Sequence, residues 1–179
     1  MSDAPKKPAR SFRIGKLPPR YRFILNPFTE TRVSKCPLCD KLNFPRKFPL
    51  LIAVEGWGPY VQGKTCKYCS KCELIICHQD ELEEQLFQAF THLRPALIGS
   101  DYFVIGTVET RTMKAALGGD SPGLDDALEH AADFKKRLDL QYDPGGWRPA
   151  DAPPRLLEPT PPDTSWRRGR GALTDRTSQ

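Results

Sequence analysis

The chain of 179 residues lacks a long hydrophobic run. Its longest apolar segments, LLIAV at residues 50–54 and LIIC at residues 74–77, have the length of strands. A membrane-spanning helix needs roughly 18–20 consecutive apolar residues, so we expect a soluble protein. The basic N-terminus is followed by no apolar segment of the secretory type. We therefore expect a cytoplasmic protein, whose cysteines stay reduced and bind metal.

Catalytic motifs are also missing. None of the three histidines belongs to an H-E-x-x-H pattern, and no H-x-E sequence precedes a P-C-x-x-C pair as in the nucleobase deaminases. No thioredoxin-like βαβ pattern surrounds the cysteine pairs. Asp80 and Glu81 are acidic groups close to the cysteines, but they fit the start of a helix better than the role of a general base. We assign no catalytic residue and favour a protein that is not an enzyme.

The charge is concentrated at the N-terminus. Residues 1–22 carry seven Lys or Arg and one Asp, a net charge of +6, whereas the whole chain has +5. The remainder is therefore close to neutral. A nucleic-acid binder of the usual kind would spread its positive charge over a folded face. This distribution predicts a basic arm attached to a nearly neutral body.

Composition divides the chain into three parts. Residues 1–20 and 148–179 are rich in Pro and Arg, show no helical or strand period, and are expected to be disordered. Residues 21–147 alternate apolar runs with turn signals and predict one folded domain. Within it, we expect a metal-binding module at residues 33–79 and a part with helices and a strand at residues 80–147.

Local patterns predict an α+β fold. Residues 47–69 indicate two strands around the turn EGWGP, and the spacing of leucines predicts an amphipathic helix over 81–93. The expected elements that follow are a strand in SDYFVIGTVET, a short helix in RTMKAAL ended by Gly118 and Gly119, a second helix from Ser121 and Pro122 to Leu138, and a short strand in LQYD. We therefore expect a small β-hairpin module packed with amphipathic helices and a further strand.

Six cysteines are grouped in a way that predicts a metal site. CPLC at residues 36–39 is one C-x-x-C pair, and CKYCSKCELIICH at residues 66–78 contains two overlapping pairs. Two knuckle turns can complete the four-coordinate sphere of zinc, with thiolates at about 2.3 Å. We favour ligation by four of these residues: Cys36, Cys39, Cys69 and Cys72. Three alternates remain open: Cys66, Cys77 and His78.

The order of knuckle, hairpin, knuckle and strand over residues 33–79 resembles the zinc ribbon family. The resemblance implies the same four cysteine ligands and a structural zinc ion. The wider chain, with YRFILNPFTETRVSKCPLCD ahead of the hairpin, resembles uncharacterised bacterial zinc-ribbon proteins, which implies no activity. A treble clef is the competing interpretation, because Ser70 and Glu73 form a capping box. The spacing also does not separate zinc from iron.

Basic and aromatic residues predict a nucleic-acid surface. The candidates are Lys6, Lys7, Arg10 and Arg13 in the arm, Lys67 and Lys71 at the second knuckle, and Trp57 and Tyr60 at the hairpin tip. Such groups suit phosphate contact and base stacking, although solvated lysines also offset a thiolate site. We expect binding of nucleic acid or a nucleoprotein complex. The alternatives are a protein-protein adaptor that uses the GWGPY tip and a helix over 124–138, and, less favoured, a metal- or thiol-dependent enzyme.

Overall fold

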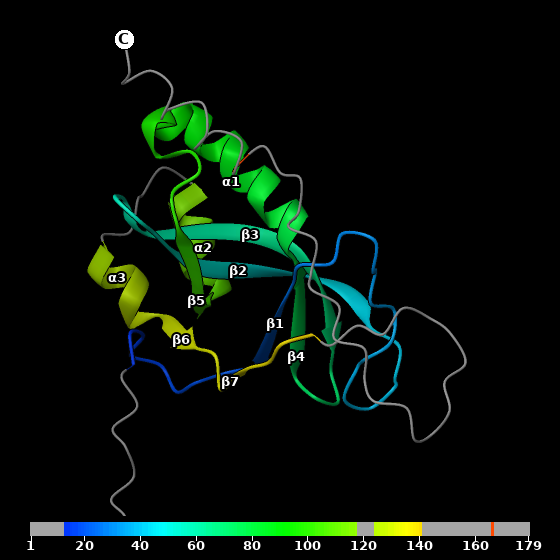
Figure 1. The fold of residues 1–179 in the computed structure, drawn as a ribbon. Coiled ribbons are helices and arrows are strands. Elements are labelled where there is room, and N and C mark those ends of the chain that lie inside the picture. Colours follow the sequence, from blue (N-terminus) through cyan, green and yellow to red (C-terminus); the bar gives the residue numbers. More distant parts are fainter. Residues whose placement is uncertain (1–12, 118–123, 141–165, 167–179) are drawn as a thin grey trace, which may run out of the picture.

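The computed structural model describes residues 13–117, 124–140 and Trp166 (Figure 1). Four expectations lie wholly or largely outside these residues. They are the disorder of the two tails, the stop at Gly118 and Gly119, the cap at Ser121 and Pro122, and the strand in LQYD. Among the described residues, no helix has both the length and the apolar character needed to span a membrane.

The fold is built on one curled sheet of seven strands (Figure 1). The order across the sheet is β6-β5-β2-β3-β4-β1-β7. The strands are β1 (Arg22–Asn26), β2 (Phe44–Val54), β3 (Gly58–Cys69), β4 (Leu74–His78), β5 (Tyr102–Val108), β6 (Ala131–Asp133) and β7 (Lys136–Arg137). The pairs β1–β4 and β1–β7 are parallel, and the other pairs are antiparallel.

The predicted α+β class is wrong, because the described structure is mainly β. Its helices are short: α1 (Gln79–Leu93), α2 (Thr110–Leu117), α3 (Leu124–Glu129) and a 3-10 turn at Pro95–Leu97. The hairpin is not a small separate module. Apolar residues on both faces of β2 are buried, so the strand needs cover on both faces and a second neighbour at its other edge, which β5 supplies.

The sequence predicts a helix that runs to Leu138, but α3 ends at Glu129, so this prediction is wrong for the residues that follow. Residues that continue the helical spacing are extended instead, because Ala131 and Ala132 pair with β5. The approach is very close at Gly106, where a Cβ atom would lie 2.0 Å from the carbonyl oxygen of Ala132. A side chain at this position would push β6 away. Pairing between distant segments therefore overrides the local helical period.

Other expectations are confirmed. β2 and β3 form the predicted hairpin, and Gly56 and Gly58 have positive φ at its tip. α1 begins close to residue 81 and ends at Leu93, and β5 is an interior strand. The segment LIIC is strand β4 and not the start of a treble-clef helix.

The two faces of the sheet carry different cores. One face packs against α1, which lies across it in Figure 1, through apolar side chains of β1 to β5 such as Phe23, Leu50 and Ile75 and of the helix, such as Leu86. A second, smaller cluster on the other face contains the following residues: Ile24, Cys36, Cys69, Leu74 and Ile76. The cysteine pairs therefore belong to the face that α1 does not cover.

Part of the basic N-terminal segment is ordered against β6. The amides of Ile14 and Gly15 donate to the carboxylate of Asp133 at 2.9 and 2.8 Å. Leu17 donates its N–H to the carbonyl of Ala131 at 3.0 Å. The chain then runs into β1, so residues 14–21 link the β6 side of the curled sheet to the β7 side.

A residue of the expected C-terminal tail is part of the core. Trp166 is 1% exposed, and its ring packs edge-on against Phe90 and Tyr102, at centroid distances of 5.5 and 6.5 Å. Its indole N–H donates to the carbonyl of Ser100 at 3.0 Å. One aromatic anchor therefore attaches a Pro- and Arg-rich region to α1 and β5.

Replacing this anchor should destabilise the body of the protein. We expect Trp166→Ala to lower the free energy of unfolding by about 3–5 kcal/mol, the usual loss for a buried aromatic side chain. Urea unfolding followed by circular dichroism measures this change. Trp57→Ala is the matched control, because Trp57 is 42% exposed and also contacts Phe90. Equal losses in the two variants would contradict the burial of Trp166.

Candidate metal centre

The first knuckle is a tight loop ahead of β2. Lys35 and Leu42 form an isolated antiparallel bridge, the amide of Cys36 donates to the carbonyl of Lys41, and the amide of Asp40 donates to Cys36. Both bonds are 2.8 Å long. Asp40 has a φ of 59°, which lets the chain reverse after Cys39. This geometry turns both sulfurs toward the sheet.

The second knuckle is the turn between β3 and β4. Cys69 is the last residue of β3 and pairs with Leu74, the first residue of β4. Cys72 lies in the connecting turn, which Glu73 closes with a φ of 49°. The strand pairing therefore fixes Cys69 directly and places Cys72 beside it.

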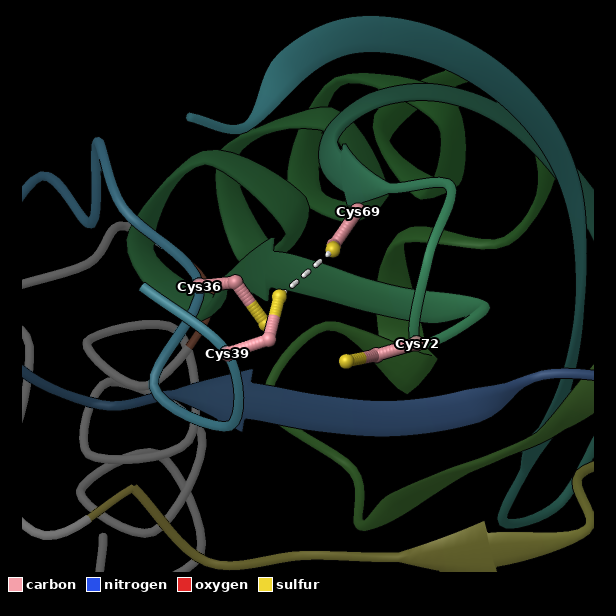
Figure 2. Close-up of side chains that lie close together, drawn as sticks. All are labelled: Cys36, Cys39, Cys69 and Cys72. Carbon is pink, nitrogen blue, oxygen red and sulfur yellow. Dashed lines mark hydrogen bonds between the residues drawn. The ribbon is translucent and has the colours of Figure 1, made fainter. Parts of the chain in front are cut away.

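The four sulfur atoms converge on one point, as Figure 2 shows. The cluster contains Cys36, Cys39, Cys69 and Cys72, whose sulfurs all lie within 4.8 Å of one another. The sulfurs of Cys39 and Cys69 are 3.6 Å apart. A zinc ion with four thiolates at about 2.3 Å separates its sulfurs by roughly 3.8 Å. These donors match a metal ion with four sulfur ligands in kind, number and spacing.

Backbone amides favour thiolates in the first knuckle. The N–H of Lys41 is the main cause that lowers the pKa of Cys39 to about 7. The amides of Leu38 and Cys39 act in the same direction on Cys36, although burial raises the pKa of Cys36 overall. Burial and the neighbouring thiols raise the pKa of Cys72 to about 12. Four thiolates this close together would repel one another. A cation at the centre would offset that repulsion by stabilising all four thiolates.

Two of the alternate ligands lie on the wrong face. Cys66 is three residues before Cys69, and side chains alternate along a strand, so the two point to opposite faces. Cys77 lies opposite Cys66 on β4, in the core under α1. Both are buried, and the adjacent Cys66 together with burial raises the pKa of Cys77 well above its usual value. Cys77 is therefore a neutral core thiol, and Cys66 lies beside it in the same core.

The third alternate, His78, lies at the far end of β4 from the second knuckle. Its Nδ1 is 3.0 Å from the amide nitrogen of Asn26 on β1, and burial lowers its pKa. The described residues offer no partner to its buried Nε2. His78 is not among the residues that converge with the four cysteines.

The acidic residues near the cysteines are engaged elsewhere. Asp80 and Glu81 pair with Arg32 at 3.2 Å, and Glu81 also receives a 2.6 Å bond from the buried Lys64. Glu73 pairs with Lys135 at 2.6 Å. None of these carboxylates belongs to the described sulfur cluster. The sequence did not single out Lys64, because only the pairing of β3 with its neighbours shows that its side chain points inward.

Those expected nucleic-acid residues that the structure describes do not form one cluster. Trp57 and Tyr60 lie at the hairpin tip and pack edge-on against Phe90, whereas Lys67 and Lys71 lie at or beyond the other end of β3. Tyr60 and Lys67 are seven positions apart along β3, which corresponds to roughly 23 Å of extended strand. In the arm, Arg13 is exposed, and three other candidates lie outside the described residues: Lys6, Lys7 and Arg10.

Comparison with known proteins adds no assignment. No protein-family model, curated protein or solved structure matches the chain. The four-sulfur cluster is compatible with a metal site on its own geometry, without a family that confirms a zinc ribbon.

Serine substitution tests which cysteines bind metal. We expect one metal ion per chain in the wild type, about the same in Cys66→Ser, and far less than one in Cys72→Ser. Cys66 and Cys72 are matched because each lies three residues from Cys69. Mass spectrometry of the purified proteins under native conditions measures the content. Metal loss from Cys66→Ser with retention in Cys72→Ser would refute the assignment.

Proposed function

We propose that the four cysteines hold one zinc ion that stabilises the fold and performs no chemistry. The observation that carries this proposal is the convergence of four sulfurs from two turns that are far apart in sequence. Four protein ligands complete the coordination of zinc, whereas a catalytic zinc usually keeps a position for water. The described carboxylates near the site are also held in ion pairs with Arg32, Lys64 and Lys135.

The loop between β1 and β2 explains why a metal would be needed there. Leu38 and Leu42 are 48% and 74% exposed, so the first knuckle buries little apolar surface of its own. Cys36 is 2% exposed and belongs to the small cluster with Ile24 and Leu74. A metal ion would join this loop to the turn between β3 and β4. It would supply binding energy where hydrophobic burial is small.

Removal of the metal should therefore loosen the structure. We expect a strong chelator to lower the melting temperature of the wild type by more than about 10 °C, since 1 kcal/mol corresponds to roughly 2–4 °C for a chain of this size. Circular dichroism with and without chelator measures the shift. Cys72→Ser should melt at the lower temperature already and respond little to chelator. A wild type that keeps its melting temperature after complete metal removal would contradict a structural role.

The same protein, on our proposal, binds nucleic acid through charge and without base specificity. The net charge of +5 and the concentration of Lys and Arg in residues 1–22 support this. Arg13 and Arg20 of this segment are exposed. Contact with phosphates releases counterions and gives an affinity that falls steeply with salt. We place this activity on the surface of the protein, with the metal as support for the fold.

Deletion of residues 1–12 tests the contribution of the arm. This deletion removes Lys6, Lys7 and Arg10 but keeps the contacts of Ile14, Gly15 and Leu17 with β6. We expect the slope of log affinity against log salt for single-stranded RNA to become shallower by about two, because each phosphate contact contributes about 0.7. Fluorescence anisotropy measures this slope. An unchanged slope would show that the arm makes no phosphate contacts. An affinity that does not depend on salt would overturn the charge-based mechanism.

A further inference from the structure

A cavity of about 470 Å³ lies where β5 and β2 separate. β5 pairs with β2 from Leu50 to Val54, whereas residues 44–49 of β2 pair only with β3 among the described strands. β5 ends at Val108, and α2 begins at Thr110. The following residues line the cavity: Arg20, Tyr21, Arg46, Lys47, Phe48, Pro49, Thr107, Val108, Glu109, Thr110 and Arg111.

The walls of this cavity are strongly cationic. Arg20, Arg46, Lys47 and Arg111 contribute four positive charges, and Glu109 contributes one carboxylate. None of the four cations forms an ion pair with another residue in the part of the chain that the structure describes. Glu109 is paired with His130 at 3.3 Å. The cavity thus has an excess of positive charge that the described residues leave without carboxylate partners.

Aromatic rings hold two of these cations in place. The guanidinium of Arg20 lies 4.7 Å from the ring centroid of Tyr21. That of Arg46 lies 5.1 Å from Phe48 and 5.0 Å from Tyr68. The three rings are buried and contact one another edge-on at 5.3 to 5.9 Å. Rigid rings therefore orient exposed guanidinium groups, which lowers the entropy that a bound anion has to remove from them.

Backbone donors add to the side chains. In an antiparallel ladder, alternate residues direct their N–H and C=O groups to the same side. Pro45 and Pro49 have no N–H to donate to β3. The backbone N–H and C=O groups of the odd-numbered residues in this part of β2 therefore point to the other edge of the strand. Lys47 lies between them and directs its N–H to the edge that β5 leaves open. α2 begins at Thr110, and the amides of its first turn have no hydrogen-bond acceptor within the helix.

We propose that this cavity is a phosphate-binding site that takes the backbone of the bound nucleic acid. Fork-shaped guanidinium groups and backbone amides are the donors that suit phosphate oxygens. The volume falls within the range of cavities that hold small ligands, about 300–1,000 Å³. The choice of nucleic acid as the source of the phosphate rests on the proposed function, whereas the phosphate site itself rests on the cavity.

The test compares a cavity arginine with an arginine elsewhere. Arg46 and Arg94 are both exposed, but Arg94 lies at the end of α1 and does not line the cavity. We expect Arg46→Gln and Arg111→Gln each to weaken the binding of a single-stranded 12-nucleotide RNA about tenfold, the usual effect of losing a charged hydrogen bond. Arg94→Gln should stay within about twofold. Fluorescence anisotropy measures the affinities.

A gain of affinity excludes misfolding as the cause. Glu109→Gln removes the carboxylate from the cavity wall and should tighten RNA binding at least about threefold, because a like charge no longer opposes phosphate. Inorganic pyrophosphate, titrated by calorimetry, should show the same order of affinities, with Glu109→Gln tightest and Arg46→Gln and Arg111→Gln weakest. This order in both titrations would support the proposal in full.

The possible failures are distinguishable. If Arg46→Gln and Arg94→Gln weaken RNA binding equally, the cavity site is overturned and the nucleic-acid function stays in place. If the wild type binds pyrophosphate but not RNA, and Arg46→Gln abolishes the pyrophosphate binding, the phosphate site is supported and nucleic acid is overturned as its ligand. Absence of binding to both probes would overturn the site and the function together.

Discussion

The alternation of side chains along β3 and β4 is the constraint on which the structure depends. It sends Cys66, Tyr68, Ile75 and Cys77 into the core under α1, and it sends Cys69, Leu74 and Ile76 to the other face. A shift of one residue in either strand would exchange these sets. The same alternation therefore builds the hydrophobic core and presents one cysteine of the second knuckle to the first.

The cysteine cluster and the cationic cavity are connected through β2. The first knuckle precedes Phe44, and residues 44–49 run from there to the cavity, paired within the described part of the chain with β3 alone. The ladder with β3 holds this segment along one edge, and a metal at the knuckle would hold its beginning. A metal bound there would fix the strand that carries Arg46 and Lys47, and the proposed ion and the proposed binding surface would then belong to one arrangement.

Features with a local signal could be predicted from the sequence. The hairpin, α1 and the strand LIIC follow from turn residues, apolar spacing and β-branched residues within short windows. The four converging cysteines could be named as well, because each C-x-x-C pair is a local signal and a predicted hairpin lies between the two pairs. A prediction that continued the strand through Cys69 would also have placed Cys66 on the face opposite Cys69, because side chains alternate along a strand.

Features that depend on distant pairing could not be predicted. β6 replaces the second half of an expected helix because Ala131 and Ala132 meet β5, and the period of residues 124–138 contains no sign of that contact. Trp166 lies in a Pro- and Arg-rich region whose composition conceals a buried anchor. The cationic cavity combines residues from three separate segments, none of which is unusual by itself.

X-ray absorption spectroscopy at the zinc edge reports the atoms bound to the metal and so tests the four-cysteine zinc site itself. Ligation by the four cysteines should give four sulfur atoms at about 2.3 Å from the metal, with no nitrogen or oxygen ligand. A shell with three or fewer sulfurs and a light atom at about 2.0 Å would contradict it. That result would indicate an open or histidine-containing site and would turn attention from a structural ion to metal chemistry.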